Sequence, residues 1–110
     1  MRILICDDDQ TTAGQLAGYI RDFFKRDHLK CPDMDLFFDG ESLLADPGEK
    51  DIVFLDVEMP GVDGIYVGQQ LKKKQPDTII FMVTSYTEYL DEAMRFHVFR
   101  YLSKPIDRKR

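Results

Sequence analysis

Acidic residues directly follow two apolar runs of the chain. Asp7-Asp8-Asp9 comes after the first run, and Asp56 comes after the run Ile52 to Leu55. The second run is typical of a strand buried on both faces, and the chain turns immediately afterwards at Pro60-Gly61. An ionised carboxylate beside a buried strand is costly unless another group compensates its charge. These positions therefore call for a functional explanation.

Two further polar residues occupy equivalent positions. Thr84 follows the apolar run Thr78 to Val83, and Lys104 follows the run Arg100 to Ser103. The carboxyl ends of the strands of an open parallel sheet meet at one edge, and ligands bind there. The spacing therefore predicts that the acidic residues, Thr84 and Lys104 collect at one edge of a sheet.

This set of residues suits phosphoryl chemistry. Crowded carboxylates raise one another's pKa, and a bound cation relieves the repulsion. Mg²⁺ typically binds a few carboxylates, waters and phosphate oxygens, so Asp7, Asp8 and Asp56 are candidate ligands. Lys104 and the Thr84 hydroxyl could hold phosphate oxygens. A spare oxygen of Asp56 could then attack phosphorus and form an acyl phosphate.

Each of these residues also has a structural explanation. An aspartate after a strand can cap the next helix, as we expect of Asp9, and taken alone Asp7-Asp8 fits either explanation. Lys104 alone would be a surface lysine, and Thr84 alone an ordinary strand residue. The joint pattern, ordered along the chain at successive strand ends, favours a phosphoryl site.

Strand and helix patterns alternate along the chain. The expected strands are Arg2–Cys6, Leu36–Phe38 (weak), Ile52–Leu55, Thr78–Val83 and Arg100–Ser103. The expected helices are an amphipathic one through Ala13 and Phe24, a short one at Gly40–Leu44, one from Gly64 to Lys74, and one through Leu90 and Met94 after the capping pattern Ser85–Glu88. This order predicts an α/β fold with a mostly parallel sheet and right-handed crossovers.

Composition narrows the function. The chain has 110 residues with 44% apolar residues, as expected for one globular domain. Its net charge of −5 argues against a broad basic surface for nucleic acid. Cys6 is expected in the core and Cys31 in a loop, without a disulfide. We find no signal peptide and no apolar run that could span a bilayer, so we expect a cytoplasmic protein.

Four segments resemble the receiver domain of bacterial two-component response regulators. They are "ILICDDD" (3–9), "VFLDVEMPGVDGI" (53–65), "IIFMVTSY" (79–86) and "YLSKPI" (101–106). The resemblance covers essentially the whole chain. It implies a flavodoxin-like, doubly wound, five-stranded parallel sheet of order 2-1-3-4-5.

The resemblance also implies a role for each residue that matches a family motif. Asp56 corresponds to the phosphoacceptor, and Asp7 and Asp8 to the acid pair that holds Mg²⁺ together with Asp56. The set of matched positions is completed by the main-chain carbonyl of Glu58 as a further metal ligand, Thr84 as the switch hydroxyl, Tyr101 as the aromatic switch, and Lys104 as the family's lysine. The bond between Lys104 and Pro105 is expected to be cis.

The segment "AMRFHVFRYLSKPI", 93–106, resembles regulators of the LytTR (LytR/AlgR) branch. That branch implies a sensor histidine kinase as phosphodonor and a C-terminal LytTR-type effector in transcriptional regulation. DNA would be bound only through that effector, and a homodimer stays open. His97 is expected to be structural and His28 to lie at the surface.

Two departures from the family pattern affect the prediction. Only five residues follow Pro105, so we expect a receiver fragment over 1–110 whose fifth helix is absent and whose sheet has an uncovered apolar face. Glu58 places a charge beside the expected phosphorylation site.

Two rival functions remain open at the sequence level. Asp7-Asp8-Asp9 formally matches the D-x-D pattern of phosphatases with an aspartyl nucleophile, although 110 residues leave no cap to select substrates. A receiver-like interaction domain that is never phosphorylated would normally lack one of the key groups, and all are present. The main hypothesis is a signalling phosphoacceptor rather than an enzyme.

Overall fold

The computed structural model describes residues 1–85, 90–95 and 98–104. Five strands form one sheet in the order β2-β1-β3-β4-β5, and all four strand pairs are parallel. The strands are β1 (Arg2–Cys6), β2 (Asp33–Phe37), β3 (Ile52–Leu55), β4 (Ile79–Thr84) and β5 (Arg100–Ser103). The helices are α1 (Gln10–Arg26), α2 (Gly40–Ala45), α3 (Gly64–Lys74) and α4 (Leu90–Arg95). The predicted doubly wound fold is confirmed.

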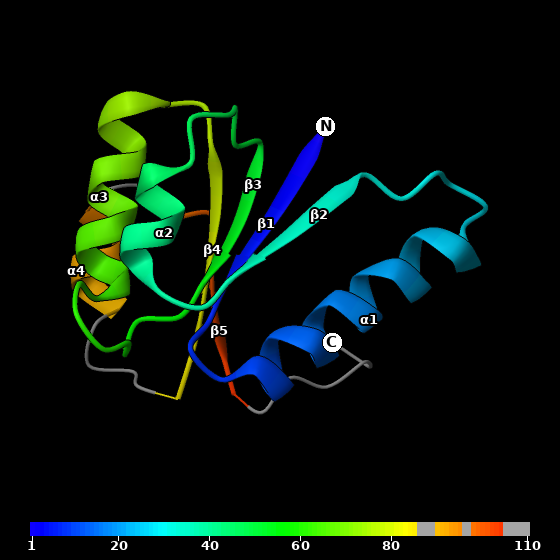
Figure 1. Cartoon of the computed structure of the whole chain (residues 1–110), viewed down its shortest axis with the longest axis horizontal. Helices are drawn as coiled ribbons and strands as arrows, with labels where there is room; N and C mark the ends of the chain where they lie inside the picture. Colours follow the sequence, from blue (N-terminus) through cyan, green and yellow to red (C-terminus); the bar gives the residue numbers. More distant parts are fainter. Residues whose placement is uncertain (86–89, 96–97, 105–110) are drawn as a thin grey trace.

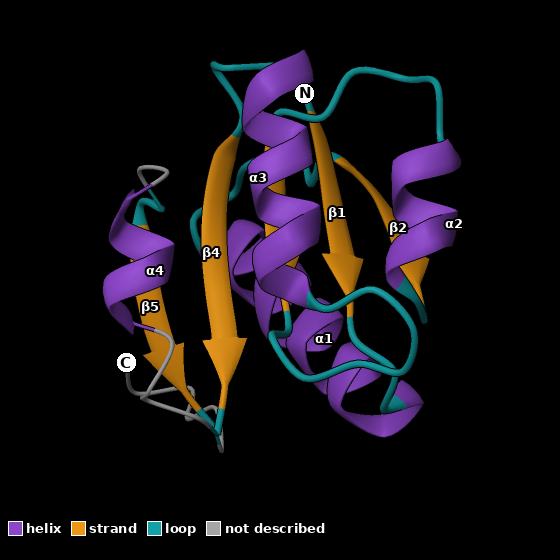
Figure 2. Cartoon of the chain, turned by 90° about the vertical axis from the view of Figure 1, so that its left-hand side faces the viewer, coloured by secondary structure: helices purple, strands orange, loops and turns teal. Residues whose placement is uncertain are grey.

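The helices cover the two faces of the sheet unequally. Figure 1 shows α1 on one side and α2, α3 and α4 together on the other, and Figure 2 looks onto the latter group with α1 behind the sheet. The larger core cluster, beneath α2 to α4, includes the fully buried Leu4, Val53 and Leu55. The smaller cluster, beneath α1, includes Ile5 and Ala17. The centre of the sheet at β1 and β3 is therefore buried on both faces.

Aspartates begin three of the helices. Asp9, Asp39 and Asp63 are the N-caps of α1, α2 and α3, and each side chain accepts a hydrogen bond from a backbone N–H of the first turn. The sequence pattern predicted Asp9 as a cap and Gly64 as the first residue of α3. The three lysines 72–74 occupy the last turn of α3, where positive charge complements the helix dipole.

Two predicted strands differ from the structure. The second strand was expected at Leu36–Phe38 but spans Asp33–Phe37, and the fourth begins and ends one residue later than expected. β2 lies at the edge of the sheet, so exposed aspartates can belong to it, and the apolar-run criterion missed them. One of them, Asp35, accepts a hydrogen bond from Nε of Arg2 on β1 at 2.8 Å.

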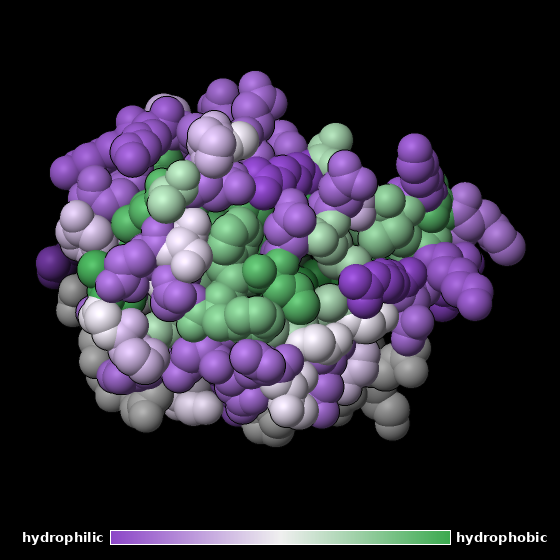
Figure 3. Space-filling model, viewed as in Figure 1, coloured by the Kyte–Doolittle hydropathy of each residue, from purple (hydrophilic) through white to green (hydrophobic). Residues whose placement is uncertain are grey.

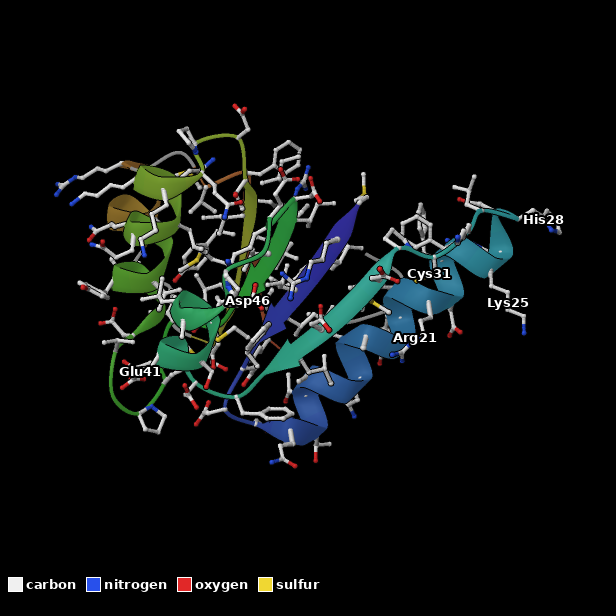
Figure 4. The ribbon with its side chains drawn as sticks, turned by 45° about the horizontal axis from the view of Figure 1, so that its top comes forward. Arg21, Lys25, His28, Cys31, Glu41 and Asp46 are labelled. Atoms are coloured by element: carbon white, nitrogen blue, oxygen red, sulfur yellow. The ribbon has the colours of Figure 1, made fainter. Side chains whose placement is uncertain are left out.

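An ion cluster occupies the opposite edge of the sheet, at the amino ends of the strands. Both terminal nitrogens of Arg2 donate to the Asp46 carboxylate, at 2.6 and 3.0 Å. The Lys50 side chain is 3% exposed, and its Nζ donates to the carbonyl oxygens of Asp46 at 2.7 Å and Gly48 at 3.0 Å. Figure 4 shows Asp46 beside α2. The cluster ties β1 to the loop between α2 and β3.

Apolar side chains remain at the surface on parts of the sheet. Figure 3 shows an apolar area between α2 and α1, where β2 lies, and Leu36 and Phe38 are 37% and 38% exposed. On the α1 side, Phe54 stacks on Phe81 at 4.7 Å between ring centroids, and Phe99 stands beside Phe81 and is 63% exposed. Apolar surface was expected on one face, but residues 105–110, where a fifth helix would begin, lie outside the described residues.

Both cysteines and one of the two histidines lie in the part of the chain that the structure describes. Cys6 is buried, Cys31 is half-buried between α1 and β2, and both are free thiols. His28 is exposed, as expected. The cap Ser85–Glu88, His97 and the peptide bond to Pro105 involve residues outside the described ranges. No helix in the described part of the chain combines the length and apolarity needed to cross a membrane.

Candidate functional site

Three carboxylates meet at the carboxyl ends of β1 and β3. The pairing of Cys6 with Leu55 places Asp7 and Asp56 next to each other, and the Asp56 N–H donates to the carbonyl of Cys6 at 2.9 Å. Asp7 and Asp56 are 4% and 5% exposed, whereas Asp8 points to the surface. One oxygen from each of the three aspartates lies within 4.8 Å of the others. The fold therefore concentrates negative charge at one point of this edge.

The orientation of Asp7 is fixed by two neighbours. Its Oδ1 accepts a hydrogen bond from the backbone N–H of Asp9 at 2.9 Å. Its Oδ2 forms an ion pair with Nζ of Lys104 at 2.8 Å. Asp9 thus both caps α1 and holds Asp7 in place.

Lys104 is the cation of this cluster. Its N–H donates to the carbonyl of Thr84 at 3.0 Å, which continues the pairing of β4 and β5 one residue beyond the end of β5. The Nζ reaches Asp56 Oδ2 at 3.2 Å as well as Asp7, and the side chain is only 18% exposed. Burial alone would lower the pKa of Lys104, but the hydrogen bond to Asp7 and the charge of Asp56 prevail and raise it. Lys104 therefore stays charged.

Asp56 has the opposite electrostatic problem. Burial, and next the charge of Asp7, raise its pKa to about 6, although the Lys104 ammonium opposes the rise. The metal-free site therefore holds more negative charge than one lysine compensates. A bound cation or protonation of Asp56 would relieve this excess.

The loop between β3 and α3 is attached to the site by backbone and sulfur contacts. The Gly64 N–H donates to the carbonyl of Val57 at 2.8 Å, and the thiol of Cys6 lies 3.6 Å from the Met59 sulfur. Burial raises the pKa of Cys6 to about 12, so this thiol is not a nucleophile at neutral pH. Gly61 adopts φ +80°, which a glycine tolerates without strain, and Glu58 is exposed on the loop.

The two predicted switch residues, Thr84 and Tyr101, differ in burial. Thr84 ends β4 and is 1% exposed. Tyr101 pairs with Met82 in the register of β4 and β5 and packs, half-buried, against the larger core cluster. Side-chain ion pairs therefore join Asp7 and Asp56 to Lys104, and the backbone of Lys104 is bonded to Thr84. Tyr101 lies on β5, three residues before Lys104.

The donor set fits a hard divalent cation. All side-chain donors are carboxylate oxygens, of which two belong to nearly buried residues and one to an exposed residue that leaves the site open to solvent. Mg²⁺ prefers oxygen ligands and keeps part of its water shell, so a half-open carboxylate cluster matches it. The residues present are thus compatible with the predicted metal.

Two features of the site were not predicted from the sequence. The ion pair between Lys104 and Asp7 depends on how far the Lys104 side chain folds back, which no pattern encodes. Gly64 was assigned only to the start of α3, but it also lies against the backbone of Asp56. The glycine at the first position of the predicted helix was the available signal for that contact.

A 2-1-3-4-5 parallel sheet with acidic residues and a lysine at its carboxyl edge defines a flavodoxin-like receiver fold. The family described as response regulator receiver domain matches residues 3–110. The chain therefore belongs to the response regulator receiver domains, the signalling domains of two-component systems.

Curated relatives point in the same direction. The sensory transduction protein LytT of Bacillus subtilis is 30% identical over all of this chain and 44% of the relative. The positive alginate biosynthesis regulatory protein of Pseudomonas aeruginosa is 30% identical over 96% of this chain and 42% of the relative. The resemblance to the LytTR branch is thus confirmed among homologues, and the chain spans less than half the length of these relatives.

A solved structure supports the same fold. The response regulator protein TrrA of Thermotoga maritima, in complex with Mg²⁺-BeF, superimposes with a TM-score of 0.73. It is 27% identical, and the match covers 96% of this chain and 88% of that chain. The architecture around the candidate site is therefore that of solved receivers.

Proposed function

We propose that this receiver accepts a phosphoryl group on Asp56 from the phosphohistidine of a sensor histidine kinase, with Mg²⁺ as cofactor. The observation that carries the proposal is the nearly buried Asp56 carboxylate, set between Asp7 and Lys104 at the carboxyl edge of the sheet. Its raised pKa reflects burial and like charge that a cation and a lysine would compensate.

The metal ligands in this proposal are Asp7, Asp8, Asp56 and the main-chain carbonyl of Glu58. A bound Mg²⁺ supplies charge neutralisation for phosphate oxygens and for the crowded carboxylates. Two backbone contacts position the carboxylates for this role. Asp9 holds Asp7 in place through its N–H, and the backbone bond to Cys6 fixes the position of Asp56 just after β3.

The transfer step forms one bond and breaks one. An oxygen of the ionised Asp56 attacks phosphorus as the bond from phosphorus to the donor's imidazole nitrogen breaks, and that nitrogen keeps the electron pair. Lys104, already 3.2 Å from Asp56, pairs with a phosphoryl oxygen, and the Thr84 hydroxyl donates to another. Catalysis by positioning and charge neutralisation suits a self-catalysed phosphoacceptor without a separate enzyme activity.

The switch would follow from the new phosphoryl oxygens. Thr84 moves towards them, and Tyr101, which is half-buried on β5, takes up the space that Thr84 leaves. A local change of charge thereby shifts the equilibrium between two surfaces of the domain. The surface around α4 and β5 is the part of the molecule that this movement would alter.

The output would be transcriptional regulation by a C-terminal LytTR-type effector. Two relatives are named as a sensory transduction protein and as a biosynthesis regulatory protein, and both extend well beyond the matched region. DNA would be contacted by the effector alone, because the net charge of this chain is −5. A cytoplasmic location and phosphorylation-dependent homodimerisation complete the proposal.

A small acyl phosphate as donor tests the proposal without a kinase. The protein is incubated with this donor and Mg²⁺, and intact mass is followed for the wild type and for Asp56→Asn. We expect one phosphoryl group per wild-type chain and none on Asp56→Asn, whereas Asp35→Asn, in the middle of β2 and bonded to Arg2, should match the wild type. An unmodified wild type would contradict the proposal, and continuous hydrolysis of phosphate monoesters would indicate a phosphatase.

A further inference from the structure

We infer that Gly64 is a positioning residue for Asp56, because its missing side chain lets α3 begin directly against the Asp56 backbone. The inference rests on the proposed phosphorylation of Asp56. It assigns to a residue without a side chain the task of setting where the reacting carboxylate lies. Gly64 is buried at the first position of α3, eight residues after Asp56 in the chain.

The contact leaves no room for a methyl group. A Cβ on Gly64 would lie 2.8 Å from the carbonyl carbon of Asp56 and 2.9 Å from Cα of Val57, and closer still to the carbonyl oxygen of Asp56. These neighbours are backbone atoms, which cannot rotate away as the end of a side chain can. Any side chain at position 64 must therefore move either β3 or α3.

The requirement for glycine here comes from close approach rather than from backbone conformation. Among the residues that the structure describes, Gly61 is the one glycine with positive φ. The Asp63 side chain already starts α3 by accepting the Tyr66 N–H at 2.9 Å, so capping does not depend on Gly64. Avoiding a clash with Asp56 is what remains to explain this glycine.

Both sides of the contact are firmly anchored. On one side, Leu55 is fully buried and the Asp56 N–H is bonded to the carbonyl of Cys6. On the other side, Val67 and Leu71 of α3 are buried in the larger core cluster. Because both α3 and the end of β3 are held in the core, neither can move as a whole to make room for a methyl group. The displacement must therefore change the position of Asp56 relative to Asp7 and Lys104.

Small displacements matter for a transfer that depends on positioning. A misplacement of about 1 Å can slow a positioned reaction about a hundredfold. We therefore expect Gly64→Ala to lower the rate of phosphorylation per folded molecule by at least tenfold (roughly 10 to 100). The measurement uses a small acyl phosphate and Mg²⁺, with intact mass for the rate and circular dichroism for the folded fraction.

Two matched controls separate positioning from loss of stability. Gly14→Ala makes the same substitution in α1, where a Cβ would meet no atom within 4 Å, and should phosphorylate at the wild-type rate. Leu16→Ala opens the smaller core cluster beneath α1, so it should destabilise the protein while each folded molecule still reacts at the wild-type rate.

The outcomes distinguish this inference from the proposed function. A wild-type rate in folded Gly64→Ala, or an equal loss in Leu16→Ala, would overturn the inference and leave the proposed function intact. An unreactive wild type would instead remove the proposed function. If Gly64→Ala alone does not fold, the substitution is combined in one protein with Gly14→Ala and Gly18→Ala. Both of these changes favour the helix α1, and a Cβ at either position would meet no atom within 4 Å. Failure to fold there as well would assign Gly64 to folding alone.

Discussion

Asp56 combines low exposure with an unfavourable charge environment. The residue is 5% exposed and lies beside Asp7, and these two causes raise its pKa to about 6. The ammonium of Lys104 offsets only part of the effect because Asp7 holds it more closely, at 2.8 Å against 3.2 Å for Asp56. The ionised Asp56 carboxylate therefore destabilises the metal-free fold near neutral pH.

Asp56→Asn should accordingly stabilise the metal-free protein. A carboxyl whose pKa is higher in the folded than in the unfolded state lowers the stability of the fold when it is ionised. For Asp56 the full cost is present above the folded pKa of about 6, and it vanishes below the unfolded pKa of about 4. We expect a gain of about 1 to 3 kcal/mol at pH 7.5 that disappears towards pH 4. Urea unfolding across this pH range measures it, and an asparagine variant less stable than the wild type at pH 7.5 would contradict the account.

Mg²⁺ should stabilise the fold through the same carboxylates. A ligand that binds only the folded state adds about 1.4 kcal/mol for each tenfold excess over its dissociation constant. Asp8 is exposed, so Asp8→Asn should fold normally but lose most of this gain, whereas Asp9→Asn should keep it. Thermal unfolding with Mg²⁺ and with EDTA measures the difference. Equal stabilisation of the wild type and Asp8→Asn would exclude Asp8 as a ligand.

The residue types at strand ends were sufficient to locate the site, but not to predict which of its residues are buried and which contacts they make. Asp7, Asp56 and Lys104 could be placed together because parallel strands end at one edge. That Asp7 is buried and Asp8 exposed follows from the side chains of a strand alternating between faces just as the strand ends. The close approach of Gly64 depends on how α3 packs against β3, which local sequence does not specify.

At the scale of elements, the end of α1 shows a strained residue away from the site. The N–H groups of His28 and Leu29 donate to the carbonyls of Lys25 and Phe24, at 3.1 and 2.8 Å, in the pattern of a Schellman motif. His28 has φ 57°, the left-handed conformation that glycine adopts most easily. Figure 4 shows His28 at the far end of α1, beyond Lys25.

His28→Gly should therefore stabilise the protein. Removing Cβ relieves the left-handed strain, and we expect a gain of up to about 1 kcal/mol in the free energy of unfolding. Asp27→Gly is the matched control, since Asp27 has φ −90° and gains no relief, so that variant should be neutral or less stable. Chemical denaturation of both variants decides, and a less stable His28→Gly would show that the histidine side chain contributes more than its strain costs.

Buried strands were predicted more accurately than the exposed edge strand. β1, β3 and β5 and α3 were predicted at their observed bounds because apolar runs and capping residues mark their ends. β2 was predicted too late because it is an edge strand, in which Asp33 and Asp35 are exposed. A pattern based on apolar residues cannot detect a strand whose stabilising contacts include an ion pair to Arg2.

At the scale of the whole molecule, charge is divided between the two edges of the sheet. The carboxyl edge carries the site with its unbalanced carboxylates. The amino edge carries the cluster of Arg2, Asp46 and Lys50, in which hydrogen bonds hold the pKa of Asp46 well below its usual range. The amino edge therefore contributes stability while the carboxyl edge, without metal, reduces it.

Asp46→Ala should destabilise the protein by about 1 to 3 kcal/mol near neutral pH, because the buried Lys50 and the half-buried Arg2 lose their shared partner. A carboxyl with a lowered pKa contributes above its unfolded pKa of about 4, and this contribution is lost as pH falls further. The difference between wild type and variant should thus shrink below pH 4 in urea unfolding. Asp35→Ala, at a half-exposed pair, should cost less than about 1 kcal/mol, and an equal cost would contradict the special role of Asp46.

The order of the sheet was predicted from the family resemblance, whereas the alternation of strands and helices gave only the parallel α/β class. Alternation fixes crossovers but not which strand lies at the centre. The amino-edge cluster escaped prediction because Asp46 and Lys50 lie in a loop and reach Arg2 only through the fold. Contacts between residues far apart in the chain are what the structure adds.

The central claim is that Asp56 itself carries the phosphoryl group. It is tested most directly by phosphorylating the wild-type protein with a small acyl phosphate and Mg²⁺, reducing the product with borohydride, and mapping the modified peptide by mass spectrometry. Borohydride converts an aspartyl phosphate to homoserine, which marks the residue permanently. The account predicts homoserine at position 56 and nowhere else. Modification of Asp7, Asp8 or another residue, with Asp56 intact, would contradict it.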